Sequence, residues 1–154
     1  MKVAVACDHG GYPLKATVID TIRAAGHDPL DLGTNSIDPV DYPDFAAAAG
    51  RAVQDGRVER AVVLCGSGIG AAVAANKLDG VRAGVCHDVY SAHQAVEHDD
   101  LNVLALGARV IGSALAADLV QTFLAARYTA EPRHARRLAK VIALERDGGP
   151  GRRE

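Results

Sequence analysis

The sequence predicts an α/β protein built on one five-stranded parallel sheet. Short apolar runs rich in β-branched residues alternate along the chain with longer segments that carry apolar residues at helical spacing. The 154 residues suffice for one domain with a full core. Polar residues also collect directly after the apolar runs, and the carboxyl ends of strands are where parallel sheets bind ligands.

The first predicted strand is the apolar run 2–7, which ends in a turn at 8–11. A helix follows over 13–25, because Pro13 suits a first helical turn and the apolar residues after it recur at helical spacing. Gly26 ends this helix. The turn places Asp8 and His9 at the carboxyl end of the first strand.

The next elements are a short strand over 29–32 and a loop over 33–41 that is rich in turn-forming residues. Tyr42-Pro43 opens a second helix that reaches Gln54, and Gly56 ends it.

The rest of the chain is organised around the stretch 61–72. A buried strand over 61–65 runs into an Ala-rich helix over 69–77 through a turn with glycine at 66, 68 and 70. Glycine lets backbone N–H groups approach a ligand, and the start of a helix favours negative charge. Cys65 and Ser67 therefore lie where a thiolate or an oxyanion would be stabilised. The spacing is neither the dinucleotide fingerprint nor a P-loop, so a purely structural turn with a buried Cys65 is an equal alternative.

The second half of the chain continues the alternation. The expected strands are 81–86 and 103–106, separated by a helix over 89–97 and a polar loop over 98–102. Two helices follow, a long one over 113–127 and a charged one over 133–146 with no strand after it. That last helix has a face free for a second subunit. Residues 1–146 thus form a single domain, and 147–154 read as a disordered tail.

Composition and charge exclude several classes of function. The net charge of −2 gives no general attraction to nucleic acid. The chain has no apolar run long enough to span a membrane, and its start is too short and too soon charged for a signal peptide. Three cysteines without paired spacing suggest reduced thiols in a cytoplasmic protein.

A metal site at the strand ends is the weaker interpretation of the cysteines. Cys7, Cys65 and Cys86 each end a predicted strand, but no spacing typical of a zinc site accompanies them. Packing as small residues is the better expectation for Cys7 and Cys86.

Two further sets of residues are candidates for catalysis or anion binding. His98 lies in the expected polar loop, either as a solvated histidine paired with a carboxylate or as an acid–base group. Arg133 and Arg137 are four residues apart and share a helix face. That face is either simply solvated or an anion site, because two adjacent guanidinium groups suit a phosphate. His9 and Arg109 could join them from the strand ends.

Together these motifs resemble the type B ribose-5-phosphate isomerases, the family that also holds galactose-6-phosphate and allose-6-phosphate isomerases. The resemblance spans residues 1–146. It is carried by ACDHGG at 6–11, DYPD at 41–44, CGSGIG at 65–70, ANK at 75–77, VRA at 81–83, HD at 98–99, NVLALG at 102–107 and RHARR at 133–137.

The resemblance implies a Rossmann-like three-layer sandwich and an aldose–ketose isomerase that uses neither a metal nor an organic cofactor. It also implies a homodimer, or two such dimers paired into a tetramer, whose active sites are shared between subunits. By position, Cys65 is the base that moves a proton between C1 and C2, and His98 assists opening of the sugar ring. The remaining implied site residues are Ser67 with the backbone of Gly66, Gly68 and Gly70 for the enediolate, Asp8 and Tyr42 for sugar hydroxyls, and His9, Arg109, Arg133 and Arg137 for the phosphate.

Two residues indicate which branch of the family the chain follows and bear on which sugar phosphate it converts. A second branch has Ser in place of the cysteine and Glu just after the last loop glycine, where this chain has Ala71. The family often has Asn where this chain has Asp99, and an ionised carboxylate only accepts hydrogen bonds. Ala71 thus assigns the chain to the cysteine branch, and Asp99 bears on the identity of the sugar more than on the reaction. The resemblance implies ribose 5-phosphate as the substrate, with allose 6-phosphate, galactose 6-phosphate or a tetrose phosphate as alternatives. A sugar-phosphate-binding module without turnover is the alternative from another class.

Overall fold

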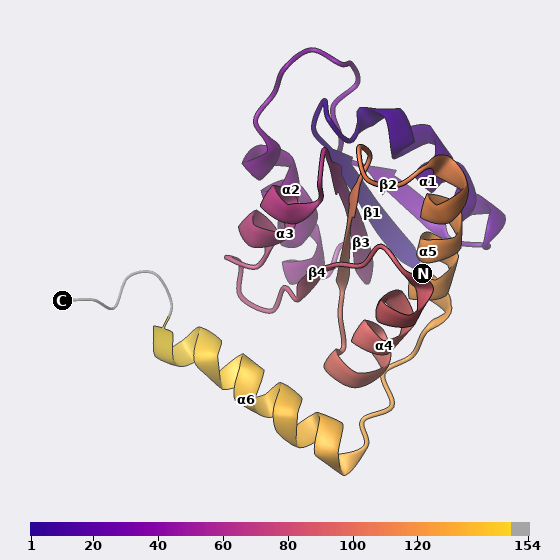
Figure 1. Cartoon of the computed structure of the whole chain (residues 1–154). Helices are drawn as coiled ribbons and strands as arrows, with labels where there is room; N and C mark the ends of the chain where they lie inside the picture. The colour runs from indigo at the N-terminus through magenta and orange to yellow at the C-terminus, as the bar shows by residue number, and fades with distance from the viewer. Residues whose placement is uncertain (149–154) are drawn as a thin grey trace.

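The computed structural model describes residues 1–148 as a five-stranded, all-parallel sheet with helices on both faces (Figure 1). The strand order across the sheet is β2-β1-β3-β5-β4. The elements are β1 (Lys2–Cys7), α1 (Tyr12–Ala24), β2 (Asp28–Asp31), α2 (Tyr42–Gln54), β3 (Arg60–Cys65), α3 (Ile69–Ala75), β4 (Ala83–Val85), α4 (Val89–Asp99), β5 (Val103–Gly107), α5 (Ser113–Ala125) and α6 (Pro132–Gly148). The predicted three-layer α/β class is confirmed.

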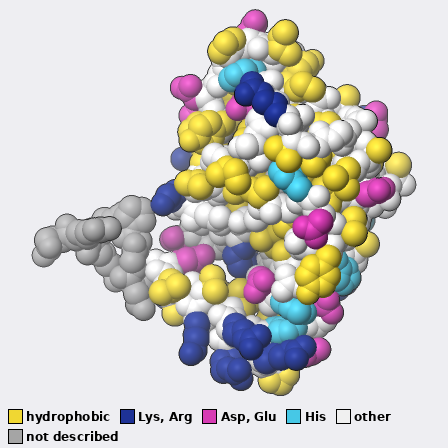
Figure 2. Space-filling view, viewed as in Figure 1, with side chains coloured by type: hydrophobic (Ala, Val, Ile, Leu, Met, Phe, Trp, Pro, Cys, Tyr) yellow, Lys and Arg dark blue, Asp and Glu magenta, His cyan; other side chains and the backbone are white. Residues whose placement is uncertain are grey.

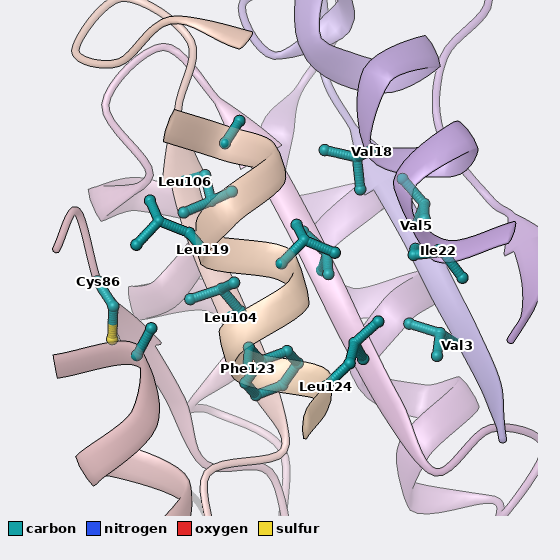
Figure 3. Packing of buried hydrophobic residues seen from close by; sticks show 14 of the residues in the cluster. Val3, Val5, Val18, Ile22, Cys86, Leu104, Leu106, Leu119, Phe123 and Leu124 are labelled. Atoms are coloured by element: carbon teal, nitrogen blue, oxygen red, sulfur yellow. The ribbon is translucent and has the colours of Figure 1, made fainter. Parts of the chain in front are cut away.

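Alternate residues of the central strands face two separate cores, as the two-residue period of a strand requires. Val3 and Val5 of β1 pack with α1, α4 and α5 on one face, whereas Ala4 and Ala6 pack with α2 and α3 on the other. Figure 3 shows the first core, where aliphatic side chains of β1 and β5 meet those of α1 and α5. Apart from Lys2 and Arg60 at their first positions, the residues of β1, β3 and β5 are apolar, because both faces of the sheet are covered.

The second core is built largely from alanine. Ala46, Ala49 and Ala52 of α2 and Ala71 and Ala75 of α3 are all buried against the sheet. Side chains this small allow a helix to lie close to the strands, so α3 can begin immediately after the turn that follows β3.

The register brings the ends of three strands to one level. Leu64 of β3 is paired with Cys7 of β1, and Cys65 is paired with Gly107 of β5. The turns that follow β1, β3 and β5 therefore leave the sheet side by side at its carboxyl edge (Figure 1).

β4 is shorter than the predicted strand 81–86, and side chains bind the backbone at its start. The side-chain amide of Asn76 donates to Ala83 O and accepts from Ala83 N, at 2.8 and 2.7 Å. The Asn102 side chain accepts from Arg82 N at 2.8 Å. The backbone groups of Arg82 and Ala83 thus have side-chain hydrogen-bond partners in place of a further strand.

α6 projects from the end of the molecule opposite to the three turns and packs against α4 (Figure 1). Its lysine and arginine side chains form the dark blue cluster at the bottom of Figure 2. The helix continues to Gly148, two residues beyond the predicted end at 146. The remaining tail residues, 149–154, lie outside the described part of the chain.

Among residues 1–148, no helix combines the length and the apolar character needed to cross a bilayer.

Truncation of Leu104 tests the importance of the first core. Leu104 is fully buried on β5, so we expect Leu104→Ala to lower the free energy of unfolding by about 2–5 kcal/mol. Ile37→Ala is the control, because this side chain is 71% exposed, and its effect should stay within about 0.5 kcal/mol. Urea denaturation followed by circular dichroism measures both, and equal losses would contradict the assignment of the core.

Candidate active site

The turn after β3 holds a thiol and a hydroxyl against backbone N–H groups. Cys65 Sγ accepts a hydrogen bond from Gly68 N at 2.9 Å, and Ser67 Oγ accepts one from Ile69 N at 3.2 Å. Cys65 is 5% exposed, whereas Ser67 is open to solvent. The N–H of Gly68 favours negative charge on the sulfur, and Ser67 keeps its own hydroxyl proton free to donate.

Two glycines of this turn are required by geometry. Gly68 has φ +82°, a left-handed conformation that residues with a Cβ rarely adopt. At Gly70, an added Cβ would come within 2.8 Å of the Tyr42 ring. Gly70 therefore lets the Tyr42 ring lie directly on the turn, although the two residues belong to different helices.

β5 supports the same turn from the other side. Ala108 N donates to Cys65 O at 2.9 Å and Arg109 N donates to Gly66 O at 3.0 Å, so main-chain pairing continues past the strands. The Arg109 side chain crosses beside Gly66, with Cζ 3.5 Å from the position a Cβ would take there. A guanidinium group thus lies at the mouth of the turn.

His87, which follows β4, joins this edge of the sheet through the backbone of β5. Its Nε2 accepts a hydrogen bond from Gly107 N at 3.0 Å. Gly107 in turn passes so close to Ser67 that an added Cβ would lie 2.6 Å from Ser67 C.

The end of β1 contributes Asp8 and His9. Asp8 is buried, and its Oδ1 accepts from Gly11 N at 2.9 Å. His9 Nδ1 accepts from Val40 N at 3.1 Å, so its Nε2 carries the proton in the neutral ring. His9 therefore presents a donor while it fixes the end of the loop that leads to Tyr42.

Lys15 anchors the other end of this loop and was not identified from the sequence. Its nearly buried Nζ donates to Thr34 O at 2.8 Å and to Asn35 Oδ1 at 2.9 Å, and it pairs with Asp31 Oδ2 at 2.8 Å. In the sequence, Lys15 is an ordinary charged residue of an amphipathic helix. Only the distant loop packed over it gives it a role.

Cys7 and Cys86 are packing residues, as expected. Both belong to the first core, and burial raises the pKa of the Cys7 thiol to about 11 and also raises that of Cys86. Among residues 1–148, no group of three or more His, Cys, Asp or Glu side chains is arranged to hold a metal ion.

A second group of candidate residues lies on α4 and α6. His98 belongs to the last turn of α4 rather than to a loop, and its Nδ1 lies 2.9 Å from Gln94 Nε2, one helical turn earlier. The helix ends at Asp99, because Asp100 adopts a left-handed conformation at its C-cap. Arg133 and Arg137 lie on the exposed side of the first turns of α6. Asp99 is exposed and lines a groove of about 340 Å³ between α6 and the β4 edge.

The two groups are at opposite ends of the sheet. Cys65 ends β3, whereas the residues after His98 lead into the start of β5. The length of β5 alone separates these levels by about 15 Å. Within one chain the fold brings together Asp8, His9, Tyr42, the turn 65–70 and Arg109, and it leaves His98, Asp99, Arg133 and Arg137 apart from them (Figure 1).

The carboxyl edge of the sheet suits one type of chemistry. Removal of a proton next to a carbonyl creates an oxyanion, which needs hydrogen-bond donors aimed at it. A thiol, a hydroxyl and the N–H groups of a glycine turn meet that need, and Arg109 and His9 offer donors for an anion beside them. Fold and site together are those of an isomerase class in which an enzyme shifts a carbonyl along a phosphorylated sugar.

Comparison with known proteins identifies the family. Residues 3–141 match the model of the family described as Ribose/Galactose Isomerase, so the chain belongs to that family and is an aldose–ketose isomerase by class. It is 40% identical over 144 residues to the ribose-5-phosphate isomerase B of Escherichia coli, which covers 94% of this chain and 96% of that protein. It is 39% identical over 132 residues to the D-erythrulose-4-phosphate isomerase of Pectobacterium atrosepticum, which covers 83% of this chain and 85% of that protein.

A solved structure agrees with this assignment. The ribose-5-phosphate isomerase B of Clostridium thermocellum superposes with a TM-score of 0.92 at 44% identity, over 96% of this chain and 99% of that one. The resemblance seen in the sequence motifs is thereby confirmed, together with the Rossmann-like fold.

The environments of the three thiols predict an order of reactivity. At pH 8 the Cys7 thiol stays protonated because its pKa is about 11, and Cys86 is shifted in the same direction by burial. We therefore expect iodoacetamide to alkylate Cys65 first in the folded protein, and all three thiols in urea. Peptide mass spectrometry measures the sites, and labelling of Cys7 as fast as Cys65 would contradict the prediction.

Proposed function

We propose that this enzyme interconverts D-ribose 5-phosphate and D-ribulose 5-phosphate through an enediolate, with Cys65 as the base. The observation that carries the proposal is the hydrogen bond from Gly68 N to Cys65 Sγ. The same turn holds Ser67, and the Arg109 side chain lies beside it. The relatives named ribose-5-phosphate isomerase B support the choice of substrate.

The proposed reaction begins with opening of the furanose ring. The bond between C1 and O4 breaks, O4 gains a proton from His98, and O1 loses its proton to water, which leaves the open-chain aldehyde. Gln94 holds His98 at Nδ1, and Nε2 is therefore the nitrogen offered to the sugar.

The Cys65 thiolate then removes the proton from C2. The electron pair of that C–H bond forms the double bond between C1 and C2, and the carbonyl electrons move to O1. Ser67 and the N–H groups of the turn stabilise the negative oxygen. Return of the proton from Cys65 to C1, and transfer of the O2 proton to O1, completes the ketose.

We place each complete active site between two subunits. One subunit contributes Asp8, His9, Tyr42, Cys65, Ser67 and Arg109, and its partner contributes His98, Arg133 and Arg137. The argument is the separation of the two groups across the sheet, because no single chain brings His98 to Cys65. Phosphate bound by arginines of α6 would thus also help to hold the subunits together.

The apolar surface of α6 supports this assembly. Leu144 is 70% exposed and Val141 is about half exposed, on a helix that packs only along part of its length against α4. The groove between α6 and the β4 edge is lined partly by the same two residues. A second copy of the chain would cover this surface.

Other phosphorylated sugars remain the alternative within the class, since one relative is a D-erythrulose-4-phosphate isomerase and the family name includes galactose. Asp99 is the residue of this chain that argues for them, because a carboxylate accepts hydrogen bonds but donates none. Initial rates on four-, five- and six-carbon aldose and ketose phosphates decide the matter. A higher kcat/KM for any of these than for ribose 5-phosphate would overturn the proposed substrate.

Replacement of Cys65 tests the role of the base. Loss of a general base typically costs about 10²–10⁴-fold in rate, so we expect Cys65→Ala to lower kcat by about 10³-fold. Binding of ribose 5-phosphate, measured by calorimetry, should persist because the phosphate contacts remain. Cys86→Ala is the matched control, because this buried thiol follows β4, two strands away from β3 in the sheet. Wild-type turnover by Cys65→Ala would exclude the cysteine base, and absence of turnover by the wild type would favour a binding module.

Subunit complementation tests the shared site. Cys65→Ala and His98→Asn should each be inactive alone on ribose 5-phosphate, because they damage different halves of every site. Refolded together, half of the dimers are mixed, and each mixed dimer has one intact site. We therefore expect about a quarter of wild-type activity. Native mass spectrometry confirms that mixed dimers form, and mixed dimers without activity would place both residues in the same subunit's half.

A further inference from the structure

His134 is a buried polar residue of α6 that the proposed mechanism does not use. Its exposed fraction is 3%, on a helix whose other first-turn side chains are exposed. It contacts three different segments, which are α4, the connection between α5 and α6, and its own helix.

Hydrogen bonds assign one neutral form to the His134 ring. Arg133 Nε–H donates to His134 Nε2 at 3.0 Å, so Nε2 carries a lone pair. The Thr129 hydroxyl donates to Glu97 O at 3.2 Å, and its oxygen lies 3.3 Å from His134 Nδ1. The ring proton is therefore on Nδ1, assigned from these partners.

The same ring lies against His98. The two ring centroids are 4.0 Å apart and the planes are tilted by 39°. Gln94 binds His98 at Nδ1 only, which leaves the ring free to pivot about that bond. The His134 ring, packed against one side, removes this freedom.

Arg133 is oriented by the opposite edge of His134. Its Nε is bound to His134 Nε2, and its Nη2 pairs with Glu131 Oε2 at 3.2 Å. Two fixed points on a planar guanidinium set its direction, although its side chain is 58% exposed.

We infer that His134 is a positioning residue that fixes the plane of His98 and the direction of Arg133 at the same time. It thereby orients His98, the proposed ring-opening group, and Arg133, a proposed phosphate-binding group, before the substrate binds. The inference rests on the proposed function, which gives His98 and Arg133 those roles. It is not a catalytic role, because His134 acts only through its two neighbours.

Two substitutions separate the two contacts. His134→Phe keeps a ring beside His98 but removes the acceptor for Arg133, so KM for ribose 5-phosphate should rise about tenfold while kcat stays within about twofold. His134→Asn removes the ring, so kcat should fall about tenfold. His93→Asn is the matched control, because His93 is a half-exposed histidine of α4 that pairs with Glu97 and should leave both constants near wild type.

NMR of the histidine ring protons gives a readout that does not depend on turnover. The His98 resonances should lose the ring-current shift in His134→Asn, retain a ring-current shift in His134→Phe and stay in place in His93→Asn. Unchanged His98 resonances in His134→Asn would overturn the inference, as would equal effects of the two substitutions on kcat and KM. If the wild type does not turn over ribose 5-phosphate, the proposed function fails, and the resonances alone decide whether His134 positions His98.

Discussion

Main-chain pairing between β3 and β5 continues beyond the strands, and the candidate site depends on it. Hydrogen bonds from Ala108 N to Cys65 O and from Arg109 N to Gly66 O extend the ladder into the glycine turn. Gly107 passes so close to Ser67 that no side chain fits between them. A thiol, a hydroxyl and a guanidinium on two separate segments are therefore held at fixed separations by backbone, which moves less than side chains do. Preorganised donors of this kind are what stabilisation of an oxyanion requires.

A parallel sheet also explains why one chain holds only part of the proposed site. All its strands end at one edge, and each helix that returns across a face ends at the other. The last turn of α4, with His98, must then lie near the start of β5, while Cys65 lies at the end of β3. A second subunit is the simplest way to bring the two edges together. The basic residues of α6 gather at the bottom of Figure 2, away from the glycine turn.

In the described part of the chain, every buried side-chain nitrogen and oxygen has a hydrogen-bond partner, and one series of these contacts leads to the candidate site. Lys15 is neutralised by Asp31 and binds the loop over 33–41, which His9 fixes at its far end through Val40. Tyr42 follows directly and lies on Gly70. The position of one aromatic ring on the turn thus depends on a salt bridge at the start of the loop, since the nearly buried Lys15 ammonium would be costly to leave unpaired.

The sequence by itself determined the order of strands and helices, the glycine turn with Cys65 and Ser67, and the placement of Arg133 and Arg137 on one helix face. Those features depend on local periodicity and on spacing, which a single segment carries. Tertiary structure alone decided that His98 lies in the last turn of a helix, that Lys15 anchors a distant loop and that His134 is buried between His98 and Arg133. These contacts join residues through packing of separate elements, and no periodicity within one segment encodes them. The left-handed Asp100 that ends α4 is a similar case, because the Arg82 side chain that binds it comes from before β4.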